Sequence, residues 1–366
     1  MDRVSMMGST QATAVVVDAP PLAGCYSDPA GTSLAGVGRL ERFAWSGDVE
    51  DAASTSEFDT ILPQADALVV SPWTKQLPTF TPERWALADR LRVIAGTFDH
   101  RYGEWIDVAE AQRRGVTVVD TSRSMTPTVA EFALAMTLNL LRDIPTAIDL
   151  VRSGGWKSRK WDQPGFVYGD LTGRRVGLAG FGSINRRYAE LLAPFHCAIA
   201  AYDPFVPDAE LGRYGIARAG SLVELAASSE IFVVGIPPTP ATQQIIGREV
   251  IDALPRGALF VLVTRMAVVE QDALWRRAEE GEIRAAIDVF APEPPLADAS
   301  FRRSPFVQPT PHIAGDTDYC HRRCFTTACD DAVAVLDGRD PIYAVTPRDE
   351  KLYLGTLAHG VGKGMI

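Results

Sequence analysis

The amino-acid sequence predicts an α/β protein of two domains, each built around a parallel β-sheet. The chain has 366 residues, a length more typical of two domains than of one. Short apolar runs rich in β-branched residues alternate with amphipathic helical patterns along nearly the whole chain. This alternation is typical of parallel sheets whose strands are joined by helical crossovers.

Four buried strands are expected in the first third of the chain. They are Thr13–Asp18, Ala67–Ser71, Arg92–Gly96 and Val116–Asp120. Amphipathic helices are expected between them at Pro82–Arg90 and Val108–Arg114. A long helix should follow at Thr128–Arg142, because Thr126 is suited to cap it and Pro127 to its first turn.

A second alternating series begins after a polar connection at Ser153–Gly169. Five core strands are expected in it: Arg175–Ala179, Ala198–Tyr202, Ile231–Ile236, Ala258–Val263 and Ala285–Phe290. Five strands with helices between them fit a doubly wound nucleotide-binding sheet. After Gly315, the amphipathic stretch Cys320–Leu336 predicts a returning helix.

Composition excludes several classes of function. The net charge is −10 and no stripe of Lys and Arg is present, so neither nucleic acid nor a membrane is expected as a partner. No stretch approaches the ~20 apolar residues of a membrane span, and the N-terminus lacks the pattern of a signal peptide. Five cysteines without framework spacing suit a reducing compartment, so we expect a cytoplasmic location.

Cys320, His321 and Cys324 lie close enough in sequence to suggest a metal site. No second ligand pair accompanies them, and Cys329 falls off the helix face that Cys320 and Cys324 would share. We therefore expect a half-buried helix here and no metal.

The stretch RVGLAGFGSINRRYAELL at Arg175–Leu192 has the features of a dinucleotide-binding turn. Gly180 suits a tight turn, and Gly182 lets backbone N–H groups approach a pyrophosphate at the start of the next helix. Asn185 takes the third glycine position, which predicts a slightly wider approach of helix and strand. A plain glycine turn between a strand and a helix is the alternative interpretation.

Asp203 ends the next strand, about 20 residues after the glycine turn, where a carboxylate can accept the ribose hydroxyls of NAD. An unpaired carboxylate would repel the extra phosphate of NADP, and the sequence Asp203-Pro204-Phe205-Val206 offers no adjacent arginine. NAD is therefore the expected cofactor.

Three ionisable residues, Arg265, Glu293 and His312, fall near the ends of later strands, where ligands gather in open α/β sheets. A guanidinium can grip carboxylate and carbonyl oxygens, and an imidazole can give a proton to a developing alkoxide. A carboxylate beside the imidazole orients it and stabilises its charged form. Taken singly, the three could also be a surface arginine, a loop carboxylate and a capping histidine.

From about Leu171 to Thr317 the chain resembles the D-isomer-specific 2-hydroxyacid dehydrogenase family, which includes phosphoglycerate and D-lactate dehydrogenases. The matching stretches include GLAGFGSIN, AYDP, IPPTPATQQIIG, AAIDVFAPEPPL and PTPHIAG, with weaker matches at RRGVTVVDT and TVAEFALA. The resemblance implies NAD-dependent hydride transfer at C2 of a small 2-hydroxy or 2-keto acid.

The resemblance also implies roles for single residues. Arg265 resembles the substrate-binding arginine, Glu293 the carboxylate partner and His312 the proton donor and acceptor. Asp288 resembles the residue that holds the nicotinamide carboxamide. Further cofactor contacts are implied for Ser183, Ile184 and Thr239.

The family implies a Rossmann-type, doubly wound NAD-binding domain at residues 124–315. It implies a discontinuous, flavodoxin-like substrate domain made of residues 1–123 and 316–366. It also implies a homodimer formed largely through the cofactor domain.

The chain departs from the family pattern at several positions. Met266 replaces the glycine after the arginine, which would put a Met side chain near the nicotinamide site, and Gly235 replaces a histidine before the P-x-T motif. The family's loop G-x-G-x-D-x-I-D offers backbone N–H groups to the substrate carboxylate. Here the loop is GTFDHRYGEWID at Gly96–Asp107, with an insertion of about five residues between His100 and Ile106.

We hypothesise that His100 or Arg101, with Arg123, contacts a distal polar or anionic part of the substrate, and that Thr97 is also a substrate-binding residue. A surface embellishment or a dimer contact is the alternative for the insertion. A basic pocket of these residues would favour a phosphorylated or phosphonate hydroxy acid, such as 3-phosphoglycerate. An NAD-sensing binding protein on the same fold is the alternative from another class of function.

Overall fold

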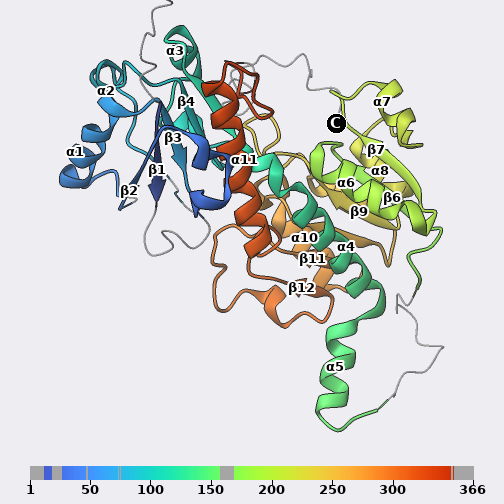
Figure 1. Cartoon of the computed structure of the whole chain (residues 1–366). Helices are drawn as coiled ribbons and strands as arrows, with labels where there is room; N and C mark the ends of the chain where they lie inside the picture. The colour runs from blue at the N-terminus through green and yellow to red at the C-terminus, as the bar shows by residue number, and fades with distance from the viewer. Residues whose placement is uncertain are drawn as a thin grey trace, which may run out of the picture. The chain divides into compact units, whose positions relative to one another are not determined.

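The computed structural model describes residues 12–18, 27–46, 48–72, 74, 76–156, 169–347 and 349 (Figure 1). Most of the expected polar connection Ser153–Gly169 and the tail after Asp349 lie outside these residues. The described chain forms two compact units: unit 1 contains the residues up to Met125 and from Thr317 onward, and unit 2 contains those between them. None of the helices in these ranges is long and apolar enough to cross a membrane.

Unit 1 is built around a five-stranded parallel sheet with the strand order β2-β1-β3-β4-β5. Its strands are β1 (Thr13–Asp18), β2 (Arg39–Ala44), β3 (Ala67–Val70), β4 (Val93–Gly96) and β5 (Thr117–Asp120). This is the strand order of flavodoxin-like folds, so the predicted fold class is confirmed for this unit. Strands β1, β3 and β4 are buried at every residue, as expected for a parallel sheet covered on both faces.

Helices cover both faces of the unit 1 sheet. One face carries Val15, Leu68 and Ile94, which form a core with the helices α1 (Ala52–Ile61), α2 (Pro82–Leu87) and α3 (Val108–Arg113). The opposite face, with Val16 and Val69, packs against Phe325 and Ala332 of α11 (Asp318–Leu336). The alternation of side chains along each strand thus separates two cores.

Helix α11 is the predicted returning helix, and it begins two residues earlier than expected. Thr317 caps it, because its Oγ1 accepts a hydrogen bond from the Cys320 N–H at 3.1 Å. Cys320, Cys324 and Cys329 are all buried. Within the described ranges, no group of three or more His, Cys, Asp or Glu side chains could hold a metal ion.

Unit 2 is built around a seven-stranded parallel sheet with the order β12-β11-β10-β9-β6-β7-β8. Its strands are β6 (Arg175–Ala179), β7 (Ala198–Tyr202), β8 (Ala217–Arg218), β9 (Ile231–Val234), β10 (Leu259–Leu262), β11 (Arg284–Ile287) and β12 (Val307–Pro309). Strand order reverses between β6 and β9, which is the switch point of a doubly wound Rossmann sheet. The predicted fold class is therefore confirmed for this unit too.

Two layers of helices pack on the unit 2 sheet. Phe232 and Phe260 lie in one core with side chains of α8 (Leu222–Ser228), α9 (Arg248–Ala253) and α10 (Gln271–Glu279). In the other layer, α4 (Thr126–Arg142) packs against α6 (Ser183–Leu192) and against β10 and β11. Thr126 is the first residue of α4 rather than its cap, because a short 3₁₀ helix, η5 (Thr121–Met125), runs directly into it.

Helix α5 (Ile144–Arg152) follows α4 and extends away from the unit 2 sheet (Figure 1). The joint is fixed by the buried Arg284, whose Nη1 donates to the Leu140 carbonyl at 2.9 Å and whose Nη2 lies 3.3 Å from Asp143 Oδ1. Asp143 adopts a φ of 49°, which ends α4 and turns the chain into α5. No residue of α5 is buried.

Candidate active site

The glycine turn lies at the carboxyl end of β6, at the switch point of the unit 2 sheet. Gly180 has a φ of 82°, and a Cβ there would lie 3.1 Å from the backbone of Gly235. Gly182 is the N-cap of α6 and provides no side-chain hydrogen bond, so the first N–H groups of the helix have no cap. Ser183 and Ile184 are the first two residues of that helix. The turn therefore presents a helix N-terminus suited to a pyrophosphate.

Asp203 follows β7, and its carboxylate is linked to the glycine turn. Its Oδ2 accepts a hydrogen bond from the Phe181 N–H at 2.8 Å, and its Oδ1 accepts one from the Phe205 N–H at 2.9 Å. The side chain is half-buried. An ionised carboxylate has about four lone-pair positions, so two remain for hydroxyl donors.

The structure brings an arginine to Asp203 that is not adjacent in the sequence. Arg218 of β8 donates from Nη1 to the Asp203 carbonyl at 2.9 Å, and it also bonds the Val206 carbonyl and the Asp208 carboxylate. The sequence Asp203–Val206 itself has no arginine, and it is parallel strand pairing that places Arg218 of β8 beside β7. The guanidinium is engaged in holding the loop after β7.

Thr239 lies in the turn after β9 and is buried. Its N–H donates to Thr242 Oγ1 at 2.8 Å, and the two Oγ1 atoms lie 3.0 Å apart. Thr242 Oγ1 also donates to the Pro237 carbonyl at 2.6 Å. These bonds fix the P-x-T turn at the same edge of the sheet as the glycine turn.

His312 and Glu293 form a hydrogen-bonded pair. Nδ1 of His312 lies 2.7 Å from Glu293 Oε2, and the Phe290 N–H donates to Glu293 Oε1 at 2.7 Å. The His312 side chain is 42% exposed. His312 has a φ of 56°, a left-handed conformation that few residues other than glycine adopt.

Asp288 fixes the segment that carries His312. This carboxylate is fully buried after β11, and its Oδ1 accepts hydrogen bonds from Thr310 Oγ1 at 2.7 Å and from the Ile313 N–H at 3.0 Å. Its Oδ2 accepts one from the Ala314 N–H at 2.8 Å. The structure thus gives Asp288 a positioning contact on each side of His312.

Arg265 follows β10, at the same carboxyl edge of the sheet as Asp288 and the glycine turn. The side chain is half-buried, and its Nη1 donates to the Thr264 carbonyl at 2.7 Å. Met266 is buried and belongs to the core of unit 2. Its side chain therefore packs into the core directly after Arg265.

The loop after β4 in unit 1 has its backbone N–H groups occupied by the protein itself. The N–H groups of Phe98 and His100 donate to the two oxygens of the Asp120 carboxylate, each at 3.0 Å. The Asp99 N–H donates to Ser122 Oγ at 2.6 Å. Asp120 and Ser122 are buried, and no motif in the sequence points to either of them. These three N–H groups are the kind that the family pattern assigns to a substrate carboxylate.

The four candidate substrate residues of unit 1 all have partners. Thr97 Oγ1 lies 2.9 Å from Thr121 Oγ1, and His100 Nδ1 lies 3.3 Å from Asp120 Oδ2. The Arg123 guanidinium lies 5.6 Å from the centre of the Tyr343 ring.

Arg101 donates from Nε and Nη2 to Glu104, each at 2.9 Å. These hydrogen bonds raise the pKa of Arg101 and lower the pKa of Glu104, so both stay charged. The charge of Arg101 is therefore balanced within the loop itself.

The inserted residues pack into the core of unit 1. Tyr102 and Trp105 are buried, and the Trp105 ring lies edge-on to Phe98 with the ring centres 4.9 Å apart. The Phe80 N–H donates to the Trp105 carbonyl at 2.9 Å. The insertion is therefore not a surface embellishment.

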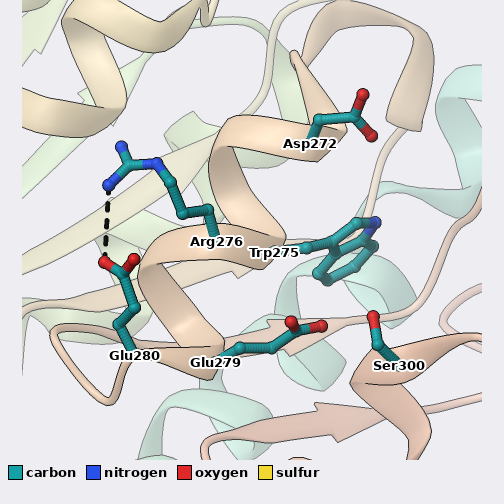
Figure 2. Close-up of a pocket in the computed structure, with 6 residues that line it drawn as sticks. All are labelled: Asp272, Trp275, Arg276, Glu279, Glu280 and Ser300. Atoms are coloured by element: carbon teal, nitrogen blue, oxygen red, sulfur yellow. Dashed lines mark hydrogen bonds and ion pairs between the residues drawn. The ribbon is translucent and has the colours of Figure 1, made fainter.

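A surface depression of about 450 Å³ lies elsewhere in unit 2, on α10 and on the 3₁₀ helix η8 (Ser300–Arg303). Figure 2 shows its six lining residues: Asp272, Trp275, Arg276, Glu279, Glu280 and Ser300. It contains none of the candidate catalytic or cofactor residues. It is therefore distinct from the candidate active site.

The chain is similar to known proteins over most of its described length. The family model of the D-isomer specific 2-hydroxyacid dehydrogenase NAD binding domain matches residues 134–314, which agrees with NAD as the expected cofactor. D-3-phosphoglycerate dehydrogenase of Methanocaldococcus jannaschii is 30% identical over 80% of this chain and 54% of the relative. Hydroxypyruvate reductase of Thermotoga maritima is 31% identical over 73% of this chain and 83% of the relative.

The chain spans about half the length of the phosphoglycerate dehydrogenases it matches. Among solved structures, a protein of Thermus thermophilus is 25% identical, with a TM-score of 0.70 over 91% of this chain and all of the other.

Proposed function

Because this chain belongs to the D-isomer specific 2-hydroxyacid dehydrogenase family, we propose that it transfers a hydride between NAD and C2 of a small 2-hydroxy or 2-keto acid. The observation that carries the proposal is the His312–Glu293 pair, whose Nδ1 and Oε2 lie 2.7 Å apart on a partly exposed imidazole. Similar proteins named hydroxypyruvate reductase and D-3-phosphoglycerate dehydrogenase support this class of reaction.

The residues of unit 2 fit a bound NAD molecule. The uncapped start of α6 would hold the pyrophosphate, and Asp203 would accept the ribose hydroxyls with its remaining lone pairs. We propose Gly180, Gly182, Ser183, Ile184, Asp203, Thr239 and Asp288 as the cofactor-binding residues. The nicotinamide supplies the hydride in reduction and accepts it in oxidation.

In the proposed mechanism, His312 holds the proton that moves to or from the C2 oxygen. Glu293 orients the imidazole and stabilises its protonated form, while the Phe290 N–H keeps the carboxylate in place. Arg265 would bind the substrate carboxylate and polarise the reacting carbonyl group. The oxidation uses the same groups in the reverse sense.

We propose unit 2 as the cofactor domain and unit 1 as the substrate domain. His100 is the favoured candidate for a distal polar or anionic part of the substrate, because Glu104 neutralises Arg101. A phosphorylated or phosphonate hydroxy acid is the second candidate substrate. The intact His312–Glu293 pair weighs against a silent NAD-sensing protein.

We propose a homodimer that uses helix α5. Ile144, Ile148 and Val151 recur at a spacing of three and four residues, so they share one helix face, and all three are exposed. An exposed apolar stripe of this kind is typical of an interface. Light scattering of Ile148→Asp should give half the mass of the unaltered protein.

The cytoplasmic location stays a prediction.

The reaction is tested by following NADH oxidation by absorbance over a panel of 2-keto acids. The panel runs from glyoxylate and pyruvate through hydroxypyruvate and its phosphate to bulky aromatic acids. Turnover that disappears in His312→Ala would support the proposal, and the preferred acid would identify the substrate class. NADH binding without turnover on any acid would contradict it and favour the sensor.

A further inference from the structure

Two residues at which the chain departs from the family pattern lie next to each other in the structure. Asn185 stands where the dinucleotide motif has its third glycine, and Gly235 stands where the family has a histidine before the P-x-T motif. A Cβ added to Gly235 would lie 2.6 Å from Asn185 Cγ and closer still to its Nδ2. No side chain larger than hydrogen fits at position 235 while the Asn185 amide keeps its place.

The Asn185 amide closes the space between the carboxyl ends of β6 and β9. Its Nδ2 donates to the Gly180 carbonyl at 2.7 Å and lies 3.4 Å from the Ala179 carbonyl. The Gly235 N–H donates to the same Ala179 carbonyl at 2.8 Å. These contacts lie directly beneath the turn that the proposed function assigns to the pyrophosphate.

The Asn185 amide is oriented by the hydrogen bond that its Nδ2 donates to the Gly180 carbonyl. Asn185 is 1% exposed, and its Oδ1 has no hydrogen-bond partner among the described residues. A buried acceptor without a partner is unfavourable, so the contact of Nδ2 with the glycine turn is what the side chain provides. A glycine at this position would leave the Gly180 carbonyl without that donor.

We propose that Asn185 and Gly235 form a matched pair that replaces the third glycine of the motif, with Asn185 as a positioning residue for the bound dinucleotide. The inference rests on the proposed function, because it assumes that the Gly180 turn binds NAD. It assigns the pair to cofactor affinity and not to the chemical step. It also explains why the motif tolerates a larger residue at position 185.

A double-mutant cycle on NADH binding, measured by fluorescence titration without substrate, tests the pair. The variants are Asn185→Gly, Gly235→Ala and the double substitution. Gly235→Ala alone should raise the Kd for NADH about 10-fold or more, because the methyl group displaces the amide from the Gly180 carbonyl. In the Asn185→Gly background the same substitution should change the Kd less than about 2-fold, because the space is free.

Asn185→Leu, which keeps the branching and the number of heavy atoms of the side chain without the donor, separates positioning from packing. It should raise the Kd and KM for NADH about 3- to 10-fold while kcat at saturating NADH stays within about 2-fold. Effects of Asn185→Gly and Gly235→Ala that multiply independently would overturn the pairing. A lower kcat with an unchanged Kd would overturn the positioning role. Since both outcomes need NADH to bind, absence of binding by the unaltered protein would instead refute the proposed function.

Discussion

Two histidine-bearing loops, one in each unit, share the same backbone conformation and the same kinds of hydrogen-bond partner. His312 in unit 2 and His100 in unit 1 both have a left-handed backbone, with φ of 56° and 62°. Each presents Nδ1 to a carboxylate, at 2.7 Å from Glu293 and at 3.3 Å from Asp120. Each loop is also held by a buried aspartate at the carboxyl end of a parallel strand.

The loops differ in how many carboxylates they use. In unit 2, Asp288 accepts the backbone hydrogen bonds that hold the loop, and Glu293 is left to serve the imidazole. In unit 1, Asp120 alone both holds the loop and contacts the imidazole. It accepts hydrogen bonds from the N–H groups of Phe98, His100 and Ser122. A carboxylate shared among neutral donors has less capacity to stabilise an imidazolium. This difference supports the proposal that His312, and not His100, carries the proton.

The largest expected effect comes from removing each imidazole. His312→Ala should lower kcat by about 10³-fold or more, because general acid–base catalysis of this kind contributes about 10² to 10⁴. His100→Ala should lower kcat/KM by about 10-fold or less, mainly through KM. Steady-state kinetics of both variants on the best substrate measure the difference. Equal losses of kcat would show that both histidines take part in the chemistry.

Glu293→Gln should lower kcat about 10- to 100-fold, because the neutral amide cannot stabilise the protonated imidazole. The amide keeps the size of the side chain and can still accept from the Phe290 N–H. Glu279→Gln, an exposed glutamate on α10, is the matched control and should leave kcat unchanged. A full rate for Glu293→Gln would remove the distinction between the two loops.

Asp288→Asn and Asp120→Asn should each lower the free energy of unfolding by about 1–3 kcal/mol, because an amide NH₂ would face backbone N–H donors. Only Asp288→Asn should also reduce kcat, about 10-fold, since its loop positions His312. Urea denaturation and kinetics on the same samples test both statements. Loss of kcat in Asp120→Asn with little change in KM would contradict the division of roles.

The smallest effect is expected from Arg101→Ala, which should change kcat/KM less than about 3-fold, because the guanidinium is already bonded to Glu104. Because the pKa of Glu104 is lowered, the Arg101–Glu104 pair stabilises the fold at pH values above the ordinary carboxyl pKa. This contribution is lost as the pH falls through the lowered pKa of Glu104 in the folded protein. In Arg101→Ala that small pH-dependent difference should vanish. A change of kcat/KM above about 10-fold would instead make Arg101 a substrate contact.

The sequence predicted the central strands of both sheets and the edge strand β5, and it missed the edge strands β2, β8 and β12. Strand β2 reads RLERFA with alternating exposed residues, and β8 and β12 have two and three residues. These three edge strands lack the apolar runs that identify buried strands, so periodicity carried little signal for them. Helix α5 was missed because no residue of it is buried by the described chain.

The residues of the candidate site could be predicted from the sequence where they belong to a sequence motif. The glycine turn, Asp203 and the His312–Glu293 pair follow from residue types at fixed distances along the chain. Asp120 and Arg218 could not be found this way. Their hydrogen-bond partners lie 15 or more residues away in the sequence, and strand pairing brings them near. The contact between Asn185 and Gly235 likewise depends on β6 and β9 being neighbours.

The division of unit 1 into two chain segments has a consequence for biosynthesis. Helix α11 covers one face of the unit 1 sheet, yet all of unit 2 separates it from β5 in the chain. While a ribosome makes the protein, the apolar face with Val16 and Val69 stays uncovered until α11 emerges, whereas the described part of unit 2 is contiguous and can fold earlier. The nascent chain therefore passes through an interval in which unit 2 can be complete while one apolar face of the unit 1 sheet is still without its covering helix.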